Sequence, residues 1–255
     1  MEEIRLNKYL SDMGICSRRQ ADRLILEGKV TVDGEPAVMG MKIREGQRVV
    51  SGGQMVAAEK RERDPGKITR PEKVLLAVNK PKGVVCTTSD KDRAMNIVEL
   101  VNYPERVYPV GRLDKDSEGL IFMTNQGELV NRIMRGANGH EKEYVVQVDR
   151  PVTKEFVRKM EAGVYLKELD ATTRPCRMRV TGTRRFHIIL TQGLNRQIRR
   201  MCEAFGYRVR GLRRIRIMNI WLGDLKTGTW RKVTAEEYQE LMSILDQDPT
   251  REGPG

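Results

Sequence analysis

The fold is decided by the stretch Gly111-Arg112-Leu113-Asp114-Lys115-Asp116-Ser117-Glu118-Gly119-Leu120-Ile121-Phe122-Met123-Thr124-Asn125. Its middle is a charged loop, and the apolar runs at 106–110 and 120–124 that flank it have the pattern of buried strands. Tight connections between strands usually carry Asn-Gly or Asp-Gly, whereas this loop carries charges of both signs between two glycines. Loops held on rigid strands often mount reactive groups. The pattern therefore indicates either a catalytic loop or a solvated connector whose charges pair with one another.

Composition points to a polyanionic partner. The chain has 255 residues, enough for one large or two moderate domains. It carries 47 Lys+Arg against 35 Asp+Glu, a net charge of +12, which favours nucleic acid or an anionic membrane surface as the partner. No apolar run is long enough for a spanning helix, and the residues 1–5 do not fit a signal peptide. We therefore expect a cytoplasmic protein with no membrane partner.

Cysteine and histidine usage argues against a metal site. The four cysteines lie far apart and the chain has only two histidines, so neither a zinc pattern nor a disulfide framework is expected. No glycine-rich phosphate-binding motif is present. The sequence thus predicts free thiols, no metal and no cofactor.

The first 60 residues predict a small domain of their own. Helical patterns at 6–13 and 18–27 are followed by a strand, an Asp33-Gly34 turn and a return strand. The second helix displays Arg18, Arg19 and Arg23, which we expect to bind RNA. Residues 61–72 are charged and broken by glycine and proline, as in a flexible linker. The predicted division is a domain at 1–60, a linker at 61–72, a larger domain at 73–248 and a disordered tail at 249–255.

The larger domain mixes strands with a few helices. Strand patterns occur at 74–79, 84–88, 107–110, 120–124, 142–148, 177–180 and 186–191. Helical patterns occur at 97–101, 129–134, 154–162, 196–205 and 235–244. Because helices and strands do not alternate regularly, a doubly wound parallel sheet is disfavoured. The predicted class is α+β, with a mixed, mainly antiparallel sheet.

Residues 196–216 are the most basic segment, with arginines at eight positions against the single acid Glu203. In residues 196–205 the arginines have helical spacing. In residues 207–217 they alternate with apolar residues as in a strand, which predicts that they lie along one side of that strand. Arginine suits phosphate because its planar fork binds two oxygens at once. The residues expected to contact RNA or DNA here are Arg196, Arg200, Arg208, Arg210, Arg213 and Arg214.

Four segments resemble one known family. Residues 111–120 are similar to the catalytic motif of the pseudouridine synthases, in the RsuA-type branch that acts on ribosomal RNA. Segments 79–85, 142–146 and 193–202 match the same branch in the expected order, and the resemblance extends over roughly residues 1–245. The N-terminal pattern resembles the S4-like RNA-binding domain. The family implies a long bent mixed sheet with a central cleft.

The resemblance also implies roles for individual residues. Asp114 occupies the family's catalytic position and would act at ribose C1′. Without the resemblance, Asp116 would be a competing candidate for the catalytic carboxylate. A carboxylate stays ionised in a cleft beside a cation. Arg199 matches the family's partner for Asp114, with Arg196 and Arg200 as alternatives.

Two further residues match positions around the reacting base. Tyr144 matches the active-site tyrosine, whose ring can stack on uracil and whose hydroxyl can take part in proton transfer. Arg112 matches a residue that enters the RNA helix where the base has left, or it contacts phosphate. Lys80 is expected to shape the sheet and its basic rim and to bind RNA, rather than to perform chemistry.

The expected function is isomerisation of one uridine to pseudouridine in large-subunit ribosomal RNA by a monomer without a cofactor. Segments 125–131 and 139–144 resemble a large-subunit member of the family, which implies a large-subunit site. A neighbouring large-subunit uridine is the first alternative and a small-subunit site is the next. A non-catalytic ribosome-assembly factor on the same fold is an alternative of a different class. A DNA-binding regulator is another, although no recognition helix is evident.

Overall fold

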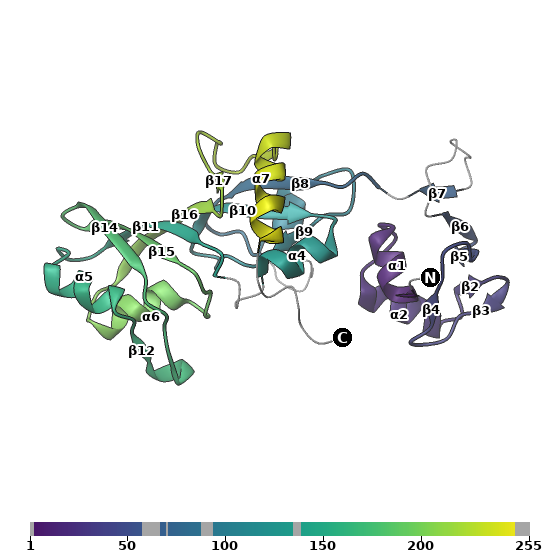
Figure 1. Ribbon diagram of the computed structural model, residues 1–255, viewed down its shortest axis with the longest axis horizontal. Helices are drawn as coiled ribbons and strands as arrows, with labels where there is room; N and C mark the ends of the chain where they lie inside the picture. Colours follow the sequence, from purple (N-terminus) through teal and green to yellow (C-terminus); the bar gives the residue numbers. More distant parts are fainter. Residues whose placement is uncertain (1–2, 58–66, 70, 88–93, 135–138, 248–255) are drawn as a thin grey trace. The chain divides into compact units, whose positions relative to one another are not determined.

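The computed structural model describes residues 3–57, 67–69, 71–87, 94–134 and 139–247 (Figure 1). The chain forms two compact units. Unit 1 consists of residues 1–73 with the short pieces 104–106 and 125–127, and unit 2 consists of the rest. Each unit has a hydrophobic core built from its own residues.

Unit 1 begins with two helices, α1 Leu6–Asp12 and α2 Arg18–Leu26. Helix α2 starts at a capping box, because the Ser17 side chain accepts from the Gln20 amide and the Gln20 side chain accepts in return from the Ser17 amide. The five-stranded sheet of unit 1 has the order β3-β2-β5-β6-β7. The strands of unit 1 are β1 Ile4–Arg5, β2 Val30–Val32, β3 Glu35–Pro36, β4 Lys42–Ile43, β5 Val49–Ser51, β6 Gln54–Ala57 and β7 Lys67–Thr69.

Two sequence expectations for unit 1 can be compared with the structure. The Asp33-Gly34 turn joins β2 to β3, and both residues have positive φ angles, 53° and 91°, as a two-residue hairpin turn requires. Part of the expected linker is ordered instead, because β7 pairs in parallel with β6. Linker positions 61–66 and 70 and the expected tail at 249–255 lie outside the described residues, whereas 71–72 are described and belong to no helix or strand.

Unit 2 is built on a nine-stranded sheet with the order β14-β15-β11-β16-β10-β8-β18, to which β9 and β17 add short pairings. Every pairing is antiparallel except that of β10 with β16. The strands are β8 Leu75–Lys80, β9 Tyr108–Val110, β10 Glu118–Thr124, β11 Lys142–Val148, β14 Arg177–Gly182, β15 Arg185–Leu190, β16 Val209–Ile217, β17 Ile220–Trp221 and β18 Trp230–Lys232. The predicted α+β class with a mainly antiparallel sheet is confirmed.

Helices cover both faces of this sheet. Their bounds are α3 Ile97–Val101, α4 Gly127–Met134, α5 Lys154–Glu161, α6 Gln197–Ala204 and α7 Ala235–Asp246. Helices α4 and α7 share one apolar cluster with β8 and β10, and α3 shares a second cluster with the opposite side of the same strands. Helices α5 and α6 pack on β11 and β15. A two-stranded ladder, β12 Tyr165–Leu166 with β13 Ala171–Thr172, follows α5 beside the short 3-10 helix Lys167–Leu169.

The parallel pairing of β10 with β16 joins the two halves of the sheet. Gly119 lies opposite Arg214 at this junction, with a φ angle of 104°. A Cβ atom on Gly119 would lie 2.2 Å from the backbone oxygen of Arg214, so the two strands can approach this closely only at glycine. The charged loop 111–117 ends at this junction.

Candidate active site

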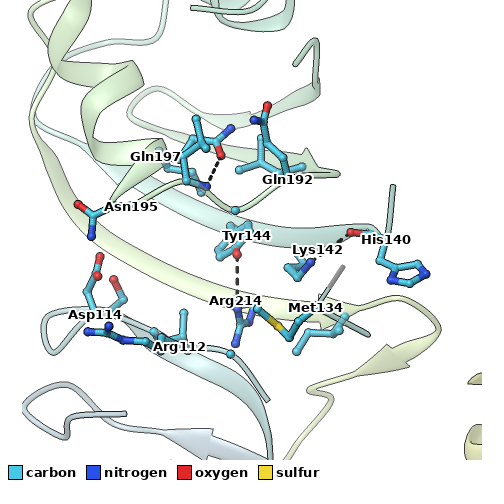
Figure 2. A pocket seen from close by; sticks show the side chains of 18 of the residues that line it. Arg112, Asp114, Met134, His140, Lys142, Tyr144, Gln192, Asn195, Gln197 and Arg214 are labelled. Carbon is cyan, nitrogen blue, oxygen red and sulfur yellow. Dashed lines mark hydrogen bonds between the residues drawn. The ribbon is translucent and has the colours of Figure 1, made fainter. Parts of the chain in front are cut away.

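A cavity of about 470 Å³ opens over the junction of β10 and β16. Its walls come from the loop before β10, from β11, from the segment between β15 and α6, and from β16. Figure 2 shows Asp114 and Arg112 on one side of this space and Tyr144 and Arg214 in its middle. Segments that lie far apart in the sequence thus meet here.

The loop that carries Asp114 is held by its own turn and by the segment 83–86 that follows β8. The Ser117 amide donates to the Asp114 carbonyl at 3.0 Å, and the Leu113 amide donates to Cys86 Sγ at 3.3 Å. The Gly83 amide donates to the Lys115 carbonyl at 2.7 Å. These bonds fix the loop while the Asp114 side chain stays 33% exposed, so its carboxylate is accessible from the cavity.

The cation beside Asp114 is Arg196, whose Nη1 lies 3.7 Å from Asp114 Oδ2 and 3.4 Å from Asp116 Oδ1. Arg199 instead pairs with Asp116, with Nη2 3.2 Å from Oδ2, and donates to the Asp116 carbonyl at 3.1 Å. The expected Arg199–Asp114 pair is therefore wrong in this structure. Arg196 precedes α6 with a left-handed φ of 51°, whereas Arg199 lies buried within the helix and meets the back of the loop.

Asp116 anchors the loop through charge. Its burial works to raise its pKa, but the charges of Arg199 and Arg196 outweigh that effect and hold the pKa below the usual value. Asp116 is thus ionised near neutral pH. The Asp116 carboxylate therefore forms ion pairs with both Arg196 and Arg199.

Tyr144 contacts a buried arginine. Arg214 Nη1 donates to Tyr144 Oη at 3.5 Å, and Arg214 Cζ lies 5.9 Å from the centroid of the ring. Arg214 Nε donates to the Leu120 carbonyl at 2.7 Å. The buried guanidinium is thereby tied to the junction and supports one side of the tyrosine.

A β-bulge controls which arginines of β16 face the cavity. Glu143 pairs with Arg216 but Tyr144 pairs with Arg214, so Ile215 is an extra residue on β16. Arg214 consequently faces the cavity with Tyr144, and Arg216 lies on the opposite face, with Nε 3.1 Å from Glu143 Oε2. The expectation that the arginines of this strand lie along one side is wrong, because the bulge interrupts the alternation.

The structure separates the predicted RNA-binding residues by exposure. Lys80 is 0% exposed, and its Nζ donates to the carbonyls of Pro81 and Val84 at 2.9 and 2.8 Å. Burial lowers its pKa. The placement of Lys80 on a basic rim is wrong, since this ammonium ties the β8 end to its loop. Arg214 is likewise buried, with 4% exposure.

The other predicted RNA-binding residues are accessible or partly so. Arg200 is half-buried and pairs with Glu168 at 3.1 Å. The exposed ones are Arg18, Arg19, Arg23, Arg112, Arg196, Arg208, Arg210 and Arg213. These positions remain predictions for RNA contact.

Two basic features were missed by the sequence patterns we used. Lys142 lies two residues before Tyr144 on β11 and lines the same cavity, as period-two alternation along the strand could have indicated. The hairpin of β14 and β15 displays a second group of exposed arginines in a stretch, 171–192, that contains no acid. They are Arg174, Arg177, Arg179, Arg184 and Arg185.

Within the described part of the chain, no cluster of His, Cys, Asp or Glu side chains has the geometry to hold a metal ion. In the same residues, no helix is both long and apolar enough to span a membrane.

Comparisons with known proteins agree with this geometry. Residues 74–204 match the family model of RNA pseudouridylate synthase, and residues 4–53 match the S4 domain. The chain is 48% identical over 251 residues to the dual-specificity RNA pseudouridine synthase RluF of Escherichia coli strain K12, covering 98% of this chain and 82% of that protein. It is 34% identical to the ribosomal large subunit pseudouridine synthase B of Bacillus subtilis strain 168, covering 95% and 97%.

A solved structure shows the same fold. The crystal structure of a pseudouridylate synthase superimposes with a TM-score of 0.66 at 25% identity, covering 93% of this chain and 99% of that one. The predicted resemblance to the pseudouridine synthases, and that of the N-terminal domain to the S4 domain, is confirmed. With the charged loop, the tyrosine strand and the arginine helix gathered around one cavity, this chain belongs to the RNA pseudouridylate synthase family.

Proposed function

We propose that this isomerase converts a specific uridine of large-subunit ribosomal RNA to pseudouridine, with Asp114 acting at the ribose. The observation that carries the proposal is that Asp114 is the only carboxylate among the described residues lining the cavity. The reaction breaks the bond from C1′ to N1, turns the ring and joins C1′ to C5. A carboxylate at C1′ can attack that carbon or remove a proton from the sugar, and neither route needs an energy source.

The neighbours of Asp114 fit the remaining requirements. A target base must leave its stack before an enzyme can act on it. The Tyr144 ring offers a surface on which the flipped uracil can stack. Arg112 is exposed and lines the cavity, so it can occupy the gap that the base leaves in the RNA. Arg196 pairs with both Asp114 and Asp116, and Arg199 pairs with Asp116. These ion pairs fix the position of the loop.

The large-subunit substrate is supported by the name of the Bacillus subtilis relative. The name of the Escherichia coli relative includes dual specificity, so a second RNA is a candidate substrate as well. Unit 1 supports RNA targeting, because its match to the S4 domain covers the helix that displays Arg18, Arg19 and Arg23. The proposed working unit is a monomer, and ribosomal RNA as substrate supports action in the cytoplasm.

The test is to map pseudouridines in ribosomal RNA from cells that lack this chain and from cells that carry Asp114→Asn. One large-subunit site should lose the modification in both. Purified Asp114→Asn should lose turnover by more than about a thousandfold, yet bind RNA within a fewfold of the parent. Asp224→Asn, an exposed acid outside the cavity, is the matched control. Turnover of Asp114→Asn within about tenfold of the parent would exclude Asp114 as the reacting group.

A further inference from the structure

Two cations lie in the cavity wall beyond the reacting carboxylate. Lys142 and Tyr144 occupy alternate positions of β11 and face the same side. Arg214 is the cross-strand partner of Tyr144. Figure 2 shows Lys142 on the side of Tyr144 away from Asp114, with Arg214 below the tyrosine hydroxyl. A uracil bound at C1′ beside Asp114 and stacked on Tyr144 would therefore point its ring toward these two side chains.

Neither cation has a counter-charge among the described residues. Lys142 Nζ donates to the His140 carbonyl at 3.3 Å. Arg214 uses Nε and Nη1 for the Leu120 carbonyl and the Tyr144 hydroxyl, and its Nη2 is buried without a hydrogen-bond partner in the described structure. A buried charged donor without an acceptor is costly. Such a group in a ligand cavity indicates that the acceptor arrives with the ligand.

Burial lowers the pKa of Lys142 to about 8, with the charge of Arg214 as the second cause. The ammonium is therefore still protonated at neutral pH. Lys142 and Arg214 are two like charges in the wall of one cavity, and they create a positive potential there because no carboxylate among the described residues pairs with either of them. The ligand group that fits this potential is an anion with exposed oxygen acceptors.

The reaction itself generates such an anion. When the bond from C1′ to N1 breaks, its electron pair stays on N1, and the detached uracil carries one negative charge spread over N1, O2 and O4. This holds whether Asp114 forms a bond to C1′ or removes a proton from the sugar. Groups that bind this charge more strongly than they bind neutral uridine lower the barrier.

We propose that Lys142 and Arg214 form the site that stabilises the detached uracil anion, by donating hydrogen bonds to its carbonyl oxygens. The inference rests on the proposed function, because it requires Asp114 at C1′. The charge disappears in the second half of the reaction. The electron pair of the anion forms the bond from C5 to C1′, the sugar releases Asp114 or regains its proton, and the proton lost from C5 is balanced by one gained at N1.

Leaving-group chemistry tests this inference. Single-turnover rates at saturating RNA would be measured on a ribosomal RNA fragment with uridine at the target, and on the same fragment with 5-fluorouridine, whose base is a more stable anion. The readout is disappearance of the original nucleoside. Lys142→Met should slow the uridine substrate about a hundredfold but slow the 5-fluorouridine substrate about tenfold or less. Lys142→Arg should recover most of the rate, and Arg214→Lys should show the same dependence on the leaving base.

The controls separate this role from simple RNA binding or folding. Lys154→Met removes a charge from an exposed position of α5 outside the cavity and should match the parent on both substrates. Equal slowing of both substrates by Lys142→Met, or a weaker affinity with an unchanged saturated rate, would overturn the inference while leaving the proposed function intact. A parent that fails to modify the uridine fragment would overturn the proposed function, and the inference with it.

Discussion

Lys142 shows how a residue of the site can oppose the stability of the fold. Burial, and then Arg214, bring its pKa from the usual 10.5 to about 8, a difference worth on the order of 3 kcal/mol. Because the pKa is lower in the folded protein, burying the charged ammonium costs stability, and this cost is complete below pH 8. It disappears as the pH rises from about 8 to about 10.5, because the folded protein loses the proton first.

Lys142→Met should therefore be more stable than the parent at pH 7, by up to about 3 kcal/mol. The difference should shrink toward zero near pH 10, where the folded parent no longer carries the buried charge. Urea unfolding of both proteins at the two pH values measures this. An equal difference at both values would show that the buried charge of Lys142 does not limit stability.

Gly119 is a second residue whose role is visible only in the packed structure. Gly119→Ala should destabilise unit 2 by more than about 2 kcal/mol, because the new methyl group would meet the backbone of Arg214 and the φ angle is left-handed. Gly228→Ala is the control, since its φ is also positive, at 81°, but no atom lies within 4 Å of its added Cβ. The control should cost about 1 kcal/mol. Equal costs in urea unfolding would mean that the junction adapts.

At the scale of elements, β16 divides its arginines among different tasks. The bulge at Ile215 sends Arg214 to the cavity and Arg216 to a pair with Glu143. Arg210 and Arg213 stay exposed along the same strand. The sequence of this strand predicts a single row of arginines. In the structure Arg214 lines the cavity, Arg216 pairs within the sheet, and Arg210 and Arg213 are exposed.

Among the arginines of residues 208–216, only the exposed ones should contribute to the salt dependence of RNA binding. Changing Arg208, Arg210 and Arg213 together to Ala should lower the slope of log K against log salt by about 0.7 to 0.9 for each phosphate that the variant no longer binds. Lys226→Ala with Lys232→Ala removes two exposed charges near β18 and serves as control. If the triple variant keeps the slope of the parent, the segment is not a phosphate-binding surface.

At the scale of the whole molecule, each unit has the means to fold by itself. The three apolar clusters of unit 2 contain no residue before Val74, and the cluster of unit 1 contains none after Val56. A domain with its own core generally folds without its neighbour. Unit 1 would then raise the effective concentration of RNA at the cavity rather than support the chemistry.

Removal of residues 1–66 should accordingly leave a folded catalytic unit that binds ribosomal RNA more weakly, by roughly 10- to 100-fold. Thermal unfolding and single-turnover modification of the full and shortened chains measure the two effects. An unfolded fragment would show that the units share one folding transition. Unchanged modification of full-length ribosomal RNA would show that unit 1 has no targeting role.

The sequence by itself determined the family and most of the elements. Strand 142–148 and helix 97–101 were predicted with the bounds that the structure shows, because periodic burial and local capping act over a few residues. The loop 111–120 indicated the chemistry through its resemblance to the family's catalytic motif, which a sequence can show because the residues of the motif are consecutive. Asp114 and Tyr144 were both placed in advance at what proved to be one cavity.

Tertiary structure alone decided which side chains meet. The pairing of Arg196 with Asp114, the burial of Lys80 and the opposite directions of Arg214 and Arg216 follow from strand register, the bulge at Ile215 and the left-handed start of α6. A bulge of one residue reverses the side of a sheet on which later side chains lie. The contacts of Arg214 with Tyr144 and of Arg216 with Glu143 join residues 70 and 73 positions apart, and local sequence patterns carry no information about them.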